Sequence, residues 1–313
     1  MAKFNDRFTR TRDRILNDLA DNHERRLFET LEQLEQKVVN AVNELPKRQG
    51  KLFDTRLAIE IRPKLKQFIE ETFSKTIDTN IREYDRAVST ILGIYGELPI
   101  PKKFKFLTDI NKEVIANLKK QTFQGFQSLA NEYLDDLANE VYQSTIVGKP
   151  FNEIVRDLKQ KINGIYASTD NEKAEELTNF IKENKFKASM NSKVDEAISE
   201  LQKIYLNQRT GDNFSRYTRQ MAHDSLMQFD ANFNMEKARE VGLTHFEYSG
   251  NIIRDSRDWC ISHVGRIMTE DEIREEWENN SWAGKSSGDP FIVRGGYNCR
   301  HHWVATDPDW LNE

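Results

Sequence analysis

The residues best suited to chemistry lie in two short clusters near the end of the chain. The first holds Cys260 and His263 in a C-x-x-H spacing, and the second holds Cys299 and His301 within the run C-R-H-H. Two thiolates and two imidazoles form one of the ligand sets of a tetrahedral structural zinc site. The sequence therefore offers Cys260, His263, Cys299 and His301 as candidate ligands of one zinc ion.

The same two cysteines have other uses that the sequence leaves open. Cys260 and Cys299 could pack as small buried hydrophobes on adjacent strands, or form a disulfide once an oxidant reaches them. A catalytic Cys/His pair would need a thiolate-stabilising site and oxyanion donors, which residue types alone do not establish. We favour packing of reduced thiols, with no cofactor and no enzymatic activity, and keep zinc, a disulfide and catalysis as alternatives.

Polar and glycine residues flank both clusters. Asp255 and Arg257 precede the first cluster and are suited to bonding backbone groups in a turn. The pair Gly295–Gly296 is expected to adopt positive φ angles that bend the chain into Asn298 and Cys299. These residues predict a structural motif, because their spacing is not that of a phosphate-binding loop.

Long helical stretches come before these clusters. Apolar residues recur at helical spacing, with few glycines or prolines between them, over residues 6–45, 57–92, 104–147, 151–162, 172–181, 194–206 and 213–241. Pro63 marks either a first turn or a kink. Gly93, Gly96, Pro99 and Pro101 predict a break, and we expect a hinge at residues 93–101.

After Gly242, the helical spacing of apolar residues gives way to short alternating and apolar runs. Gly242 itself lies where a helix C-cap is expected. His245–Tyr248 alternates, and Asn251–Ile253 and Phe291–Val293 are short apolar runs, so all three are expected to be strands of a small antiparallel sheet. Thr269 should begin a helix that runs to Trp277. The tryptophans fall in this region and predict a compact core: Trp259, Trp277, Trp282, Trp303 and Trp310.

These patterns predict a mostly α protein with a small α+β C-terminal domain. Residues 1–210 are expected to form an extended, elongated helical region, and residues 211–313 the α+β domain. The helical seams suit docking against a large assembly better than enclosing a small ligand.

Composition limits the partners. The net charge is -5, the pI is about 5.8, and the mean hydropathy is -0.75. Any DNA contact should be weak, nonspecific and local, for example at Lys102–Lys105. No apolar run reaches the roughly 20 residues of a membrane span, and two cysteines do not make a disulfide scaffold, so synthesis in the cytoplasm is expected.

The C-terminal clusters resemble those of the phage Mu protein F-like, or phage head-morphogenesis, family of minor capsid proteins. The similarity covers roughly residues 216–304. The family pattern is a helix, a D-x-R-x-x-C element, a glycine, an acidic helix and a closing N-C-R motif. The matching residues here are Asp255, Arg257, Cys260, Gly265, the helix from Thr269, Gly295, Gly296, Asn298, Cys299, Arg300 and His301.

The chain also departs from that pattern. Many members carry C-x-x-C first and H-P-N-C-R-C last, whereas here His263, Gly296 and His301 occupy three of those positions. An R-T-E element upstream in the family is replaced by His223-Asp224-Ser225. These departures weaken the zinc interpretation, and we carry no role over to residues 223–225.

The resemblance implies a virion protein of a tailed phage that acts in head morphogenesis and capsid assembly. Its expected partners are the portal protein and capsid or scaffold proteins, and its expected location is the head interior or the portal vertex. Packaging with DNA, or ejection with it, is part of that expectation, and catalysis is not. The alternatives are a metal-dependent hydrolase or toxin that uses the Cys/His cluster, and a helical DNA-binding ejection protein.

Overall fold

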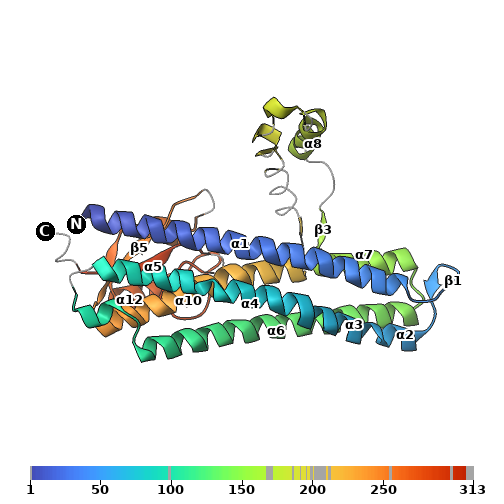
Figure 1. Cartoon of the computed structure of the whole chain (residues 1–313), viewed down its shortest axis with the longest axis horizontal. Coiled ribbons are helices and arrows are strands. Elements are labelled where there is room, and N and C mark those ends of the chain that lie inside the picture. The colour runs from blue at the N-terminus through green and yellow to red at the C-terminus, as the bar shows by residue number, and fades with distance from the viewer. Residues whose placement is uncertain are drawn as a thin grey trace. The chain divides into compact units, whose positions relative to one another are not determined.

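The computed structural model describes most of the chain, which is drawn in Figure 1 with its helices and strands labelled. The contacts within the chain divide it into two compact units. The described residues are 2–97, 100–166, 172–184, 187–190, 192–194, 196–197, 200, 209–210, 213–253, 256–296 and 299–307. Unit 1 comprises Met1–Thr30, Ile69–Asn131 and Thr218–Glu313, and unit 2 comprises Leu31–Phe68 and Glu132–Tyr217. This grouping by contacts differs from the division near residue 210 that the sequence suggested.

The mostly α fold with a small α+β region is as the sequence predicts. Helix α1 (Ala2–Asn43) fills the first predicted stretch and stops before Pro46. Its leucines and valines at helical spacing, from Leu16 to Val42, are almost fully buried. A continuous apolar stripe without internal glycine or proline therefore accounts for one long helix. Among the described helices, none is both long and apolar enough to cross a membrane.

Unit 1 contains a helical layer and the sheet. After a π-helical turn (Ile69–Phe73) come α4 (Ser74–Arg82), α5 (Tyr84–Glu97), a 3-10 turn (Lys102–Lys105), the first part of α6 (Asp109–Ile146) and most of α10 (Phe214–Val241). The Tyr84 ring lies 4.8 Å from that of Phe229, and its hydroxyl bonds to Ser225 at 2.9 Å. Tyr84 thus holds α5 against α10.

The C-terminal sheet is antiparallel, in the order β6-β5-β7. Its strands are β5 (His245–Ser249), β6 (Ile267–Thr269) and β7 (His302–Thr306), and the central strand pairs Tyr248 with Trp303. Short helices α11 (Asp258–His263), α12 (Glu270–Asn279) and α13 (Pro290–Val293) complete this part of unit 1. The predicted helix start is confirmed, because Thr269 and Glu272 form a reciprocal capping box.

Some local predictions were wrong. Asn251–Ile253 is exposed coil rather than a strand. Phe291–Val293 belongs to α13, because Asp289 caps the backbone N–H of Phe291 and Pro290 fills the first helical turn, where a missing N–H costs nothing. Gly93 and Gly96 do not break the chain, since α5 continues through both to Glu97.

Unit 2 is also helical. It contains the rest of α1 and α6, a hairpin of β1 (Lys47–Arg48) and β2 (Lys51–Leu52), α2 (Thr55–Ile59), α3 (Ile61–Phe68), α7 (Phe151–Asn163), α8 (Glu172–Asn184) and a 3-10 turn (Ala188–Met190). Strands β3 (Ile165–Tyr166) and β4 (Arg209–Thr210) pair antiparallel. Pro63 lies in the first turn of α3, one of its two predicted positions. Three predictions fall wholly or partly outside the described residues. They are much of the helix expected over 194–206, part of the hinge expected at 93–101, and the position of Trp310.

A buried histidine joins α1 to the α4–α5 corner of unit 1. His23 is almost fully buried, and its Nε2 lies 3.1 Å from Oε2 of Glu83. Arg26 donates two hydrogen bonds to the same carboxylate, at 3.0 and 2.5 Å. Burial and the nearby Arg26 charge lower the pKa of His23 to about 4. The folded protein therefore keeps His23 neutral at pH values where the unfolded chain protonates it.

This arrangement predicts a specific pH dependence of stability. Since the unfolded histidine titrates near pH 6.5, the free energy of unfolding should fall by about 3 kcal/mol from this group as the pH drops from about 6.5 to 4. Substituting His23→Gln should remove that part of the pH dependence. Urea unfolding of both proteins at pH 7 and pH 4.5 measures it. Parallel pH profiles for the two proteins would show that His23 does not titrate in this way.

Candidate functional site

The two cysteines meet in the core of unit 1. Cys260 lies on α11 and Cys299 lies just before β7, yet their sulfur atoms are 3.8 Å apart and both side chains are buried. The two cysteines that the sequence offered as ligands of one ion therefore lie together. The expectation that the cysteines lie on adjacent strands is wrong, because α11 forms where a strand was expected.

A tyrosine and a histidine complete the cluster. The hydroxyl oxygen of Tyr248, on β5, is 3.5 Å from Sγ of Cys260 and 3.6 Å from Sγ of Cys299. Nδ1 of His301 is 3.7 Å from Sγ of Cys299, and the ligand atoms of Cys260, Cys299 and His301 all lie within 4.8 Å of one another. The His301 ring stacks on that of Tyr248, with centroids 5.5 Å apart. Four side chains from three segments therefore surround one point.

Glycine leaves the space that this cluster occupies. A Cβ atom at Gly295 would lie 2.4 Å from Sγ of Cys260 and 3.0 Å from Sγ of Cys299. A Cβ at Gly250 would lie 2.6 Å from the His301 ring. Gly296 adopts the predicted positive φ, at 112°. Gly295 is thus needed for close approach, which is a different reason from the one the sequence suggested.

His263 faces away from the two thiols. Its Nδ1 lies 2.7 Å from the carbonyl oxygen of Trp259, and its Nε2 lies 2.8 Å from Oε2 of Glu276. Arg266 donates to the same Glu276 carboxylate at 2.6 Å. Both ring nitrogens of His263 therefore have partners, and the structure brings together only three of the four predicted metal ligands.

Two arginines place positive charge near the cysteines. Arg294 is buried, has a φ of 55° that is uncommon outside glycine, and lies 4.0 Å from Asp224. Arg257 precedes α11, and its Nε would be 2.7 Å from a Cβ placed at Gly284. Charges of this sign favour a thiolate over a thiol.

The surroundings shift the pKa values of the two thiols in opposite directions. Hydrogen bonding with Cys299, together with burial, raises the pKa of Cys260. Hydrogen bonding from Cys260, assisted by His301 and Arg294 and opposed by burial, lowers the pKa of Cys299 well below its usual value. Burial also raises the pKa of Tyr248, and the two thiols add to this effect. Cys299 is therefore the sulfur that carries negative charge most readily.

A second layer of buried polar groups joins this site to α1. Arg12 forms a buried, two-bond ion pair with Asp230 of α10. Asp13 lies 3.0 Å from Nε2 of His302, the residue after His301, and its carboxylate also interacts electrostatically with His301. Burial opposes ionisation of Asp13, but the two histidines and Arg12 outweigh it, and the pKa of Asp13 is lowered.

The remaining predicted site residues have structural positions. Gly265, with a φ of 82°, turns the chain between α11 and β6, and its N–H bonds to the carbonyl of Tyr248 at 2.8 Å. Arg300 is half-exposed and reaches Asp21 at 3.4 Å, so it points away from the sulfur atoms. Asp255 and Asn298 lie outside the described residues.

Sequence reasoning missed Tyr248 and Arg294 as members of the site. Tyr248 could have been found, because its alternation with Phe246 places both on the buried face of one strand. No signal in the sequence marks Arg294 as buried.

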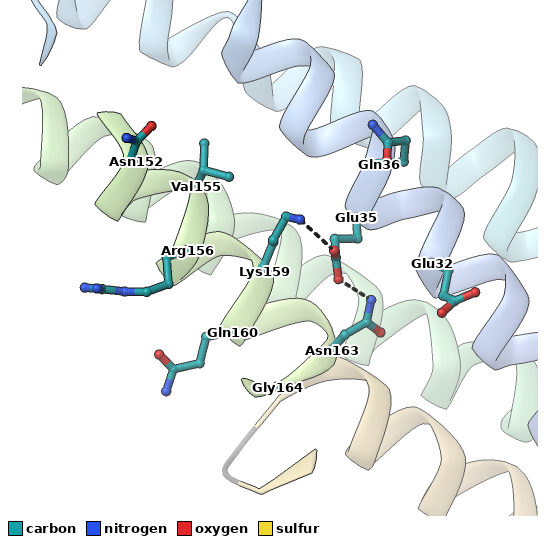
Figure 2. Close-up of a pocket in the computed structure, with 10 residues that line it drawn as sticks. All are labelled: Glu32, Glu35, Gln36, Asn152, Val155, Arg156, Lys159, Gln160, Asn163 and Gly164. Atoms are coloured by element: carbon teal, nitrogen blue, oxygen red, sulfur yellow. Dashed lines mark hydrogen bonds and ion pairs between the residues drawn. The ribbon is translucent and has the colours of Figure 1, made fainter. Parts of the chain in front are cut away.

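Unit 2 contains a separate polar cavity of about 730 Å³ between α1 and α7, shown in Figure 2. Glu35 lies at its centre and bonds to Asn163 at 2.6 Å and to Lys159 at 3.5 Å (Figure 2). The Lys159 ammonium group therefore balances the charge of the carboxylate, and Asn163 donates a hydrogen bond to it. The Cys/His cluster in unit 1 is therefore the better candidate site.

Comparisons of this chain with known protein families, with characterised proteins and with solved structures find no match.

The packing at Gly295 yields a mutational prediction. Gly295→Ala should lower the free energy of unfolding by about 1–3 kcal/mol, because the new methyl group must displace both sulfur atoms. Gly93→Ala is the matched control, since a Cβ at this helical position meets nothing within 4 Å, and it should stabilise by up to about 1 kcal/mol. Denaturant unfolding measures both. Equal effects of the two substitutions would contradict the close packing.

Proposed function

We propose that this protein is a minor head protein of a tailed phage, which acts in head morphogenesis at the portal vertex and carries no catalytic activity of its own. The observation that carries the proposal is the contact between Cys260 and Cys299, 3.8 Å apart. These residues belong to the first and last elements of the family-like motif, which are separated by 39 positions in the sequence.

The other residues of the motif support the same interpretation. Gly265 makes a turn, Thr269 caps α12, and Gly295 gives the thiols room. Each of these positions is constrained by folding rather than by contact with a substrate. A structural module of an assembly protein requires a motif with this property, which supports the resemblance on which the proposal rests.

The environment of the cysteines gives no support to hydrolysis. Both sulfur atoms are buried, and Tyr248, His301 and Gly295 pack against them. A nucleophilic thiolate must reach a substrate carbonyl, so it normally lies partly exposed in a cleft. An enzyme that uses this cluster would therefore need it to open.

Co-purification tests the proposed partner. Tagged full-length protein should be co-expressed with the portal protein encoded in the same genome. We expect a complex that survives size-exclusion chromatography, and few copies of the protein per purified particle by quantitative mass spectrometry. The portal protein alone and an unrelated tagged protein are the controls.

Two results would overturn the proposal. One is absence of the protein from purified particles together with absence of a portal complex. The other is hydrolysis of nucleic acid or peptide by the purified protein that is lost on Cys260→Ala while the circular dichroism spectrum is unchanged.

Contact with packaged DNA should be weak. Lys102 and Lys103 lie in a short basic 3-10 turn on a chain of net charge -5. Affinity for duplex DNA of mixed sequence should fall at least roughly tenfold between 50 and 200 mM salt, and should fall further in Lys102→Glu/Lys103→Glu. Fluorescence anisotropy titrations measure it. Tight binding that is insensitive to salt would contradict this expectation.

A further inference from the structure

We propose that Cys260, Cys299 and His301 bind one zinc ion, with the hydroxyl oxygen of Tyr248 in the fourth position. The site would join α11 to the segment that enters β7. The inference rests on the geometry of these side chains and is independent of the proposed function.

The sulfur–sulfur distance and three further distances among the four atoms are close to those of a tetrahedral site. With Zn–S bonds of about 2.3 Å and Zn–N or Zn–O bonds of about 2.0–2.1 Å, two sulfurs should lie about 3.8 Å apart, and sulfur and nitrogen or oxygen about 3.5 Å apart. The two sulfurs are 3.8 Å apart. Tyr248 Oη lies 3.5 and 3.6 Å from them, and His301 Nδ1 lies 3.7 Å from Cys299. The ligand atoms of Cys260, Cys299 and His301 all lie within 4.8 Å of one another, so shifts of the side chains would bring them to one ion.

The charge of the ion suits the surroundings. Two buried thiolates without a cation would carry two negative charges in a site that excludes water, which is strongly unfavourable. A zinc ion would neutralise them. Thiolate and imidazole together are a ligand set that zinc prefers over magnesium or calcium.

Asp13 places a carboxylate near the candidate ligand His301. Histidines that bind a metal usually present their other ring nitrogen to a carboxylate, which fixes the ring orientation. The Asp13 carboxylate interacts electrostatically with His301 but lies 3.0 Å from Nε2 of His302, and Nε2 of His301 has no hydrogen-bond partner among the described residues. Asp13 therefore brings negative charge from α1 close to the site and does not orient the His301 ring.

The two simpler alternatives explain less. A disulfide requires the sulfurs to approach to about 2.05 Å, nearly half the present separation. Plain packing of thiols needs neither a tyrosine hydroxyl directed at both sulfurs nor an imidazole directed at one of them. The sequence favoured plain packing because it did not reveal Tyr248 and did not show that His301 lies beside Cys299.

The sharpest test asks which of the two histidines, His301 or His263, is needed for zinc binding. Untagged full-length protein, purified without chelator from zinc-containing medium, should contain about one zinc per chain by mass spectrometry of the metal. Cys260→Ser, Cys299→Ser and His301→Gln should each lose it. His263→Gln is the matched control and should keep it, because His263 is bonded to Trp259 and Glu276. Tyr248→Phe should keep the ion and weaken its binding at least tenfold.

Measurements on the protein without substitutions test the zinc site even if a variant fails to fold. Cobalt added to the chelator-treated protein should give thiolate-to-metal charge-transfer absorption and the visible bands of a tetrahedral ion. Chelator should lower Tm by about 5 °C or more, and zinc but not magnesium should restore it. Both thiols should react in denaturant after zinc removal.

Several outcomes would overturn the proposal. These are a metal-free chain whose Tm does not respond to zinc, a disulfide between Cys260 and Cys299, or loss of the ion from His263→Gln as complete as from His301→Gln. Unchanged zinc affinity in Tyr248→Phe would remove the tyrosine from the site.

Discussion

The thiols of Cys260 and Cys299 meet beside the backbone of Gly295, and the C-terminal part of unit 1 depends on that contact. It brings the start of α11 to the end of the chain segment that feeds β7. Strand β5 is connected to both, because the hydroxyl oxygen of its Tyr248 lies within 3.6 Å of each sulfur. A small α+β region has limited apolar surface, so a contact that joins α11 to the segment before β7 offsets part of the entropy lost on ordering the loops.

Buried charges extend this constraint to the first helix. The Arg12–Asp230 pair joins α1 to α10, and Asp13 with His302 joins α1 to β7. Desolvation makes such pairs weak sources of net stability, but removal of one partner leaves an uncompensated charge. Their effect is therefore to specify one arrangement within unit 1. His301, adjacent to His302, connects that arrangement to the two cysteines.

Sequence periodicity predicted the helices well and the small strands poorly. Helix α1 and helix α10 follow from uninterrupted apolar stripes, and α12 follows from the capping residues Thr269 and Glu272. Phe291–Val293 was misassigned because a three-residue apolar run does not distinguish helix from strand, and the Asp289–Pro290 start decided the outcome.

The sequence predicted which residue types form the site, but it did not predict which side chains each of them contacts. Spacing marked Cys260, Cys299 and His301, but it marked His263 equally, and only the fold shows that Glu276 engages that histidine. The Arg12–Asp230 pair spans 218 positions and leaves no local trace in the sequence. Buried polar contacts of this kind depend on tertiary packing, which residue spacing does not encode.

The central claim is that Cys260, Cys299 and His301 form one tetrahedral metal site that organises this region. X-ray absorption at the zinc edge of the untagged, unmutated protein tests it most directly. The account predicts a first shell of two sulfur atoms at about 2.3 Å and two nitrogen or oxygen atoms at about 2.0–2.1 Å. A shell of nitrogen and oxygen alone, or a purified protein with no zinc, would contradict it.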